Sequence, residues 1–186
     1  MSFKELLVKI ASELDRAGID YMVIGGQAVL VYGEPRLTKD IDITLGISPQ
    51  KMNMILNVID NIGLDILVSN IESFVKRTWV IPAIDKETGI RVDFIFSASP
   101  YEKEAMKRTV KVQIDGYHVK FVSVEDLIIQ KLVSGRPRDI EDVKKILLKN
   151  PVHMIYVEKW LKEFDESLGI DTLKTFRKIL KEVKDE

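Results

Sequence analysis

One stretch of the chain, residues 21–45 (YMVIGGQAVLVYGEPRLTKDIDITL), constrains the fold more than any other. It begins with a short apolar run that suits a buried strand. This run ends at Gly25 and Gly26, where the backbone must turn or come close to another group. A helix over residues 27–32 would follow directly, with its free N–H groups and the positive end of its dipole facing an anion. The stretch therefore predicts a strand, a turn and a helix with a phosphate group bound at the turn.

The second half of this stretch predicts a strand that carries two acidic side chains. Polar and apolar residues alternate over residues 39–45 (KDIDITL), so one face meets a core and the other presents Asp40 and Asp42. Two carboxylates on one face suit a hard cation such as Mg²⁺, which binds one or two carboxylates, phosphates and water. An Asp-x-Asp pair is more often a solvated strand face, so the pair alone leaves both interpretations open.

A third carboxylate lies in an apolar strand predicted over residues 90–96 (IRVDFIF). Alternation puts Asp93 on the same face of this strand as Arg91. Burying a carboxylate without a partner is costly. Asp93 is therefore expected either to pair with Arg91 or another cation, or to join Asp40 and Asp42 around a metal ion.

A second informative stretch spans residues 127–142 (LIIQKLVSGRPRDIED). Ser123 is expected to cap the first of its two helices, and Pro137 to begin the second. Lys131 lies among apolar residues, so its ammonium group must either reach solvent or meet an anion. For a single lysine, reaching solvent is the commoner outcome.

Cap and turn residues predict further element boundaries. Capping boxes at Ser2-x-x-Glu5 and Ser69-x-x-Glu72 are expected to begin two helices. The pair Asp115-Gly116 predicts the turn of a hairpin.

Taken together, the acidic strands and the glycine turn resemble the nucleotidyltransferase superfamily to which DNA polymerase beta belongs. The motifs that carry the resemblance are Gly25-Gly26 after a strand, Arg36-x-Thr38-x-Asp40-x-Asp42, and Val92-Asp93-Phe94. The resemblance implies that Mg²⁺, or Mn²⁺ in its place, is bound by Asp40, Asp42 and Asp93. It also implies that Asp93 is the general base.

The same resemblance implies contacts to a nucleoside triphosphate. Gly25 and Gly26 would let the backbone approach its phosphates, and Arg36 and Thr38 would contact phosphates or order the loop. Arg36 could equally form a plain surface ion pair with a neighbouring acid.

The stretch around Lys131 is similar to the lysine helix and Arg-Asp motif of AbiEii-type nucleotidyltransferases, the toxin members of bacterial toxin–antitoxin systems. This similarity implies that Lys131, and with it Arg136 and Arg138, contacts the phosphates of the nucleotide. Asp139 could simply anchor these basic side chains. The resemblance as a whole spans residues 21–148.

The activity implied is transfer of a nucleoside monophosphate from an NTP to a hydroxyl group of an RNA, a tRNA or a protein, with a cognate antitoxin as a further partner. One alternative is an antibiotic nucleotidyltransferase of the aminoglycoside or lincosamide kind. Another is a degenerate copy that only binds nucleotide or serves as an antitoxin-like module. Such copies usually lack a carboxylate, and all three are present here.

The fold class expected is α/β: a nucleotidyltransferase fold with a twisted mixed sheet, the two carboxylate strands side by side, and flanking helices. Residues 1–122 are expected to form the core, and residues 123–186 a helical C-terminal part packed on it.

The chain has no cysteine, which excludes disulfides and thiolate zinc sites, and no apolar run near the roughly 20 residues of a membrane span. A cytoplasmic enzyme is expected. The net charge of -1 argues against a surface that attracts nucleic acid everywhere.

Overall fold

A computed structural model describes residues 2–34, 38 and 40–185 of the chain. The chain divides into two compact units. The first comprises Met1–Gln27 and Leu37–Val122, and the second comprises Ala28–Arg36 and Ser123–Glu186. Helix α2 (Gly25–Tyr32) therefore begins in the first unit and ends in the second.

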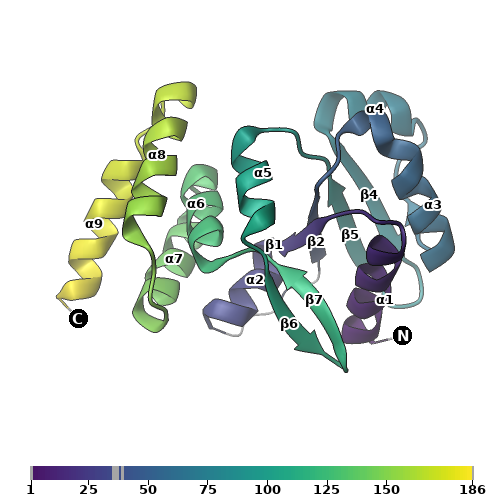
Figure 1. Cartoon of the computed structure of the whole chain (residues 1–186), viewed down its shortest axis with the longest axis horizontal. Coiled ribbons are helices and arrows are strands. Elements are labelled where there is room, and N and C mark those ends of the chain that lie inside the picture. The colour runs from purple at the N-terminus through teal and green to yellow at the C-terminus, as the bar shows by residue number, and fades with distance from the viewer. Residues whose placement is uncertain (1, 35–37, 39, 186) are drawn as a thin grey trace. The chain divides into compact units, whose positions relative to one another are not determined.

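The first unit is built on a mixed, seven-stranded sheet (Figure 1). The strand order is β3-β4-β5-β2-β1-β7-β6, in which β2 and β5 are parallel, as are β1 and β7, and the other neighbours are antiparallel. The expected α/β fold is confirmed, and the two carboxylate strands, β2 and β5, are neighbours as expected. The strands are β1 (Tyr21–Ile24), β2 (Asp40–Leu45), β3 (Asp65–Ile66), β4 (Val80–Asp85), β5 (Ile90–Ile95), β6 (Val110–Ile114) and β7 (Tyr117–Phe121).

Helices cover this sheet and bury its apolar side chains. Helices α1 and α3 pack against each other, α1 also contacts β7, and α4 contacts β4. The predicted capping box of Ser2 and Glu5 is present at the start of α1, and the predicted hairpin at Asp115-Gly116 joins β6 to β7. The helical segments of this unit are α1 (Phe3–Arg16), the 3₁₀ helix η1 (Pro49–Lys51), α3 (Met52–Ile62), α4 (Ile71–Thr78) and α5 (Pro100–Lys107).

The second unit is helical, with α6 in contact with each of α7, α8 and α9 (Figure 1). Ser123 caps α6 as predicted, because its side chain accepts a hydrogen bond from the backbone N–H of Asp126. None of the helices in the described part of the chain is long and apolar enough to cross a membrane. The helices are α6 (Val124–Ser134), α7 (Pro137–Lys149), α8 (Met154–Leu168) and α9 (Thr172–Lys184).

One predicted helix start is wrong by one residue. Helix α4 is capped by Asn70, whose side chain accepts a hydrogen bond from the backbone N–H of Ser73 at 3.0 Å, and not by Ser69. Asparagine and serine are about equally good caps. When both are adjacent in the sequence, the local pattern therefore does not decide between them.

Candidate active site

Three acidic side chains and one arginine share one face of the neighbouring strands β2 and β5. In this parallel pair, Asp42 lies opposite Asp93 and Asp40 lies opposite Arg91. We call these four residues the acid face. Residues that alternate with them, such as Ile41, are fully buried on the other side of the sheet. The alternation of the two strands therefore brings three carboxylates together from two distant parts of the chain.

The start of α2 lies directly against the acid face. Gly25 is the first residue of this helix and has a left-handed φ of 63°. A Cβ atom on Gly25 would lie 2.2 Å from Asp42 Oδ2, a separation that real Cβ atoms do not show. Glycine is therefore required both by the backbone conformation and by the carboxylate beside it. Gly26 is the second residue of the helix, so α2 begins two residues earlier than expected.

Thr38 and Asp40 are bonded to α2 by Gln27, a residue that was not among the predicted site residues. Gln27 is buried, and its side-chain amide donates hydrogen bonds to Thr38 Oγ1 at 2.7 Å and to the backbone oxygen of Asp40 at 3.4 Å. A polar side chain inside an otherwise apolar helical run is the signal that could have revealed it, because a buried amide needs partners. Arg36 lies outside the described residues.

Asp93 is paired with a cation on its own strand. Arg91 Nε donates a hydrogen bond to Asp93 Oδ1 at 3.0 Å. This hydrogen bond raises the pKa of the Arg91 guanidinium, and the negative charges of Asp93, Asp40 and Asp42 raise it further, although burial acts against them. The side chain of Arg91 is 49% exposed and that of Asp93 is 19% exposed. The partner that a carboxylate in this apolar strand requires is therefore present.

The chemistry of the acid face fits a hard divalent cation. Its donors are carboxylate oxygens, the ligands that Mg²⁺ prefers, and the absence of a side chain at Gly25 makes room for the carboxylate of Asp42. In the conformation described, no three His, Cys, Asp or Glu side chains among the described residues are grouped closely enough to hold a metal ion. Asp93 is bonded to Arg91 instead. Asp40 and Asp42 could hold such an ion, and Asp93 could join them through the oxygen that Arg91 does not engage, or through both oxygens after Arg91 moves away.

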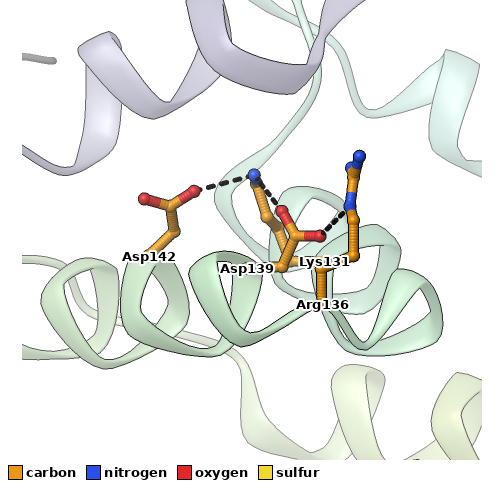
Figure 2. Close-up of polar contacts among 4 residues, drawn as sticks. All are labelled: Lys131, Arg136, Asp139 and Asp142. Atoms are coloured by element: carbon orange, nitrogen blue, oxygen red, sulfur yellow. Dashed lines mark hydrogen bonds and ion pairs between the residues drawn. The ribbon is translucent and has the colours of Figure 1, made fainter.

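Lys131 belongs to a separate group in the second unit, which we call the lysine cluster: Lys131, Arg136, Asp139 and Asp142 (Figure 2). Lys131 Nζ donates hydrogen bonds to Asp139 Oδ1 at 2.6 Å and to Asp142 Oδ2 at 2.8 Å. Arg136 Nε donates to the other oxygen of Asp139 at 2.7 Å. Figure 2 shows the amine of Lys131 between the two carboxylates. The ammonium group thus meets anions that the chain itself supplies.

Three members of the lysine cluster are nearly inaccessible to solvent. The side chains of Lys131, Asp139 and Asp142 are 6%, 4% and 8% exposed, whereas that of Arg136 is 74% exposed. Burial acts to raise the pKa of Asp139, but the hydrogen bonds from Lys131 and Arg136 outweigh it and hold this pKa below its usual range. Asp139 therefore anchors both basic side chains.

Asp142 was not among the predicted site residues. Its position three residues after Asp139 on α7 places both carboxylates on one face of that helix, and this spacing could have revealed it. Arg138, on the first turn of α7, is exposed.

The exposed residues of α9 are all basic. Every exposed residue of this helix is Lys174, Arg177, Lys178, Lys181 or Lys184. Their spacing of three or four residues makes them neighbours, and like charges at such spacings slightly destabilise a helix. Lys174 is paired with Asp171 at 3.7 Å, Arg177 with Glu158 of α8 at 3.1 Å, and Lys178 with Glu182 at 3.9 Å. The first four of these cations, together with Asp165 and Asp171, line a hollow of about 690 Å³.

Comparison of the sequence with known families gives one match. The model of the family described as "Nucleotidyltransferase of unknown function (DUF6036)" matches residues 2–184. The matched range includes the acid face and the lysine cluster. A search of the curated proteins finds no match.

Several solved structures share the fold at low sequence identity. An antigenic nucleotidyltransferase-like protein from Paracoccidioides brasiliensis has a TM-score of 0.57 and 18% identity, with 88% of this chain and 87% of that chain covered. The antibiotic-resistance factor ANT(2'')-Ia gives 0.61 and 15%, with 89% and 92% covered. The lincosamide antibiotic adenylyltransferase LnuA, with lincomycin bound, gives 0.55 and 18%, with 77% and 95% covered. At these identities the likeness concerns the fold.

Proposed function

The chain belongs to the nucleotidyltransferase family DUF6036, and on this premise we propose that it transfers a nucleoside monophosphate from an NTP to a hydroxyl group of an RNA, such as a tRNA, or of a protein. The hydroxyl oxygen forms a bond to the α-phosphorus, the bond from this phosphorus to the bridging oxygen breaks, and pyrophosphate leaves. Asp93 accepts the proton of the attacking hydroxyl.

The observation that carries this proposal is the register of the two acidic strands. Asp42 lies opposite Asp93, Asp40 lies on the same face, and the absence of a side chain at Gly25 makes room for the Asp42 carboxylate. Asp40 and Asp42 would hold Mg²⁺, or Mn²⁺ in its place, with Asp93 as a third ligand. When bound, the ion would neutralise negative charge on the triphosphate.

The glycine turn is proposed to bind the phosphates. Gly25 and Gly26 open α2, and the first N–H groups of a helix have no partner within that helix. Thr38 is held by Gln27 in the loop that leads to β2, which supports a role in ordering this loop. We also propose that Arg36 contacts a phosphate, and this proposal rests only on the position of Arg36 in the motif.

The lysine cluster is proposed to contribute further phosphate contacts. An ammonium group has three N–H donors, and those of Lys131 that bind Asp139 and Asp142 fix its position. The remaining donor, together with Arg136 and Arg138, would contact the nucleotide. A purely structural cluster is the competing role.

The cationic face of α9 favours an anionic acceptor over an antibiotic of the aminoglycoside type. Aminoglycosides are polyamines and carry positive charge near neutral pH, so a hollow lined by four cations and only two carboxylates matches them poorly. An RNA backbone would instead relieve the repulsion among the cations of α9. A toxin–antitoxin role, with a cognate antitoxin as partner, agrees with an RNA or protein acceptor.

The experiment that tests this proposal is a transfer assay with each of the four NTPs labelled at the α-phosphate. RNA, cell extract and a panel of antibiotics serve as acceptors, with Mg²⁺ present. Label on RNA or on a protein of the extract is the expected result, and the variant Asp40→Asn/Asp42→Asn should abolish both transfer and Mg-nucleotide binding. The matched control is Asp60→Asn/Asp185→Asn, which removes two exposed carboxylates elsewhere.

The variant Asp93→Asn separates catalysis from binding in the same assay. Loss of a general base should slow transfer by at least roughly 10², with a smaller effect on nucleotide affinity. Label on an antibiotic would favour the alternative acceptor. Nucleotide binding without transfer to any acceptor would favour a catalytically inactive module.

A further inference from the structure

The acid face contains its own cation. On β2 and β5, Asp40, Asp42, Asp93 and Arg91 occupy four adjacent positions of one sheet face. Like charges that lie directly opposite each other on neighbouring strands destabilise a sheet. Asp42 and Asp93 form such a pair, and Arg91 reduces their repulsion through its hydrogen bond to Asp93 and its charge.

A metal ion and Arg91 would compete for this face. Arg91 binds Asp93 Oδ1 and brings a positive charge beside the carboxylates, which opposes the binding of a second cation at the same face. A guanidinium does not lose its charge at any physiological pH, so this opposition is relieved when it moves away and not by deprotonation. Its side chain is half exposed, which leaves it room to move.

We propose that Arg91 is both a positioning residue and a nucleotide-binding residue. In the metal-free protein, its guanidinium takes the place of the metal ion beside the carboxylates. Once metal is bound, the guanidinium turns to the phosphates of the NTP. This inference rests on the proposed function. A guanidinium displaced from a carboxylate has a natural new partner in a phosphate, because both anions accept two parallel hydrogen bonds from it. Arg91 thus stabilises the fold before metal binding and contacts the substrate afterwards.

The proposal predicts effects of opposite sign for one substitution. In Arg91→Met, Mn²⁺ alone should bind at least about fivefold more tightly, since a competing cation is gone. ATP at saturating Mg²⁺ should bind about tenfold more weakly, since a charge-assisted hydrogen bond is lost. A residue that merely supports the fold would weaken both. Mn²⁺ affinity is measured by electron paramagnetic resonance without nucleotide, and ATP affinity by calorimetry.

Two further variants make the result specific. Arg91→Lys keeps the positive charge and loses the planar donor pair, so its Mn²⁺ affinity should stay near the parental value while its ATP affinity falls. Arg77→Met removes an exposed arginine from α4 and should leave both affinities unchanged. Circular dichroism of each variant reports folding, and Arg91→Lys tests the phosphate contact if Arg91→Met does not fold.

The outcomes separate this inference from the proposed function. The role of Arg91 would be overturned if Arg91→Met bound Mn²⁺ with the parental affinity. It would also be overturned if both Arg91→Met and Arg91→Lys bound ATP with the parental affinity. Either result would leave the acid face intact as a metal site. Failure of the parent protein to bind Mn²⁺ would overturn the metal site itself, and the role of Arg91 with it.

Discussion

At the scale of single residues, Gly25 has the most sharply defined requirement. Its φ of 63° alone costs a residue with a side chain about 1–2 kcal/mol. The Cβ of alanine would in addition displace the Asp42 carboxylate from its position 2.2 Å away. Gly25→Ala should therefore lower the melting temperature and also weaken the binding of Mn²⁺ and of Mg-ATP.

Gly18→Ala is the matched control for this prediction. Gly18 has a nearly identical φ of 66°, but a Cβ atom there would meet nothing within 4 Å. It should show the loss of melting temperature without the loss of metal affinity. Equal metal affinities in the two variants would mean that Asp42 does not need the position it has beside Gly25.

The site residues that the sequence revealed are those whose position follows from local periodicity. Alternation along a strand put Asp40 and Asp42 on one face, and their placement is as expected. Gln27 was missed because its role depends on a hydrogen bond to Thr38 across a loop. The direct opposition of Asp42 and Asp93 depends on which strands pair in parallel, and 50 residues of chain separate them, so periodicity alone cannot supply it.

At the scale of elements, the lysine cluster joins α6 to α7 through buried charge. A lone lysine on an apolar helix could be replaced by methionine with little loss of stability. Here, however, Lys131→Met would leave Asp139 and Asp142 buried without their cation. Breaking a buried ion pair in this way costs about 3–5 kcal/mol. A large decrease in the free energy of unfolding, measured with denaturant, is therefore expected. The control is Lys144→Met, which removes a partly exposed pair with Glu182 and should lower this free energy far less.

The triple variant Lys131→Met/Asp139→Asn/Asp142→Asn distinguishes a phosphate role from a structural one. Removing all three charges eliminates the uncompensated carboxylates, so part of the lost stability should return. If Lys131 contacts the nucleotide, ATP affinity should stay low in the triple variant although the fold is recovered. Parental ATP affinity would instead make Lys131 a structural residue and limit the resemblance to the superfamily rather than its AbiEii-type members.

The start of a helix was predictable where only one nearby residue could cap it. Ser2 and Ser123 begin helices as expected, because their side chains bond to backbone groups three residues away. The pairing of Lys131 with Asp142 lies beyond such reasoning. It links two helices across eleven positions, and only their packing decides which anion the lysine meets.

At the scale of the whole molecule, the second compact unit begins its long segment at Ser123 and also contains a short segment from earlier in the chain. Residues Ala28–Arg36 belong with Ser123–Glu186. Within that unit, Asn150 Nδ2 donates to the backbone oxygen of Tyr32 at 2.7 Å, and Lys145 pairs with Glu34 at 2.8 Å. Because α2 is one continuous helix, the two units share an element as well as a chain connection.

This shared helix predicts that the units do not unfold independently. A fragment of residues 1–122 would leave Tyr32 and Glu34 without Asn150 and Lys145, and would expose apolar residues of α2 such as Val29. Calorimetry of the full chain should give one transition whose calorimetric and van't Hoff enthalpies agree. The fragment should melt at a lower temperature than the full chain and bind a dye specific for exposed apolar surface. The opposite result would be two separate transitions in the full chain, with the fragment reproducing one of them. It would show that the two units unfold independently although they share α2.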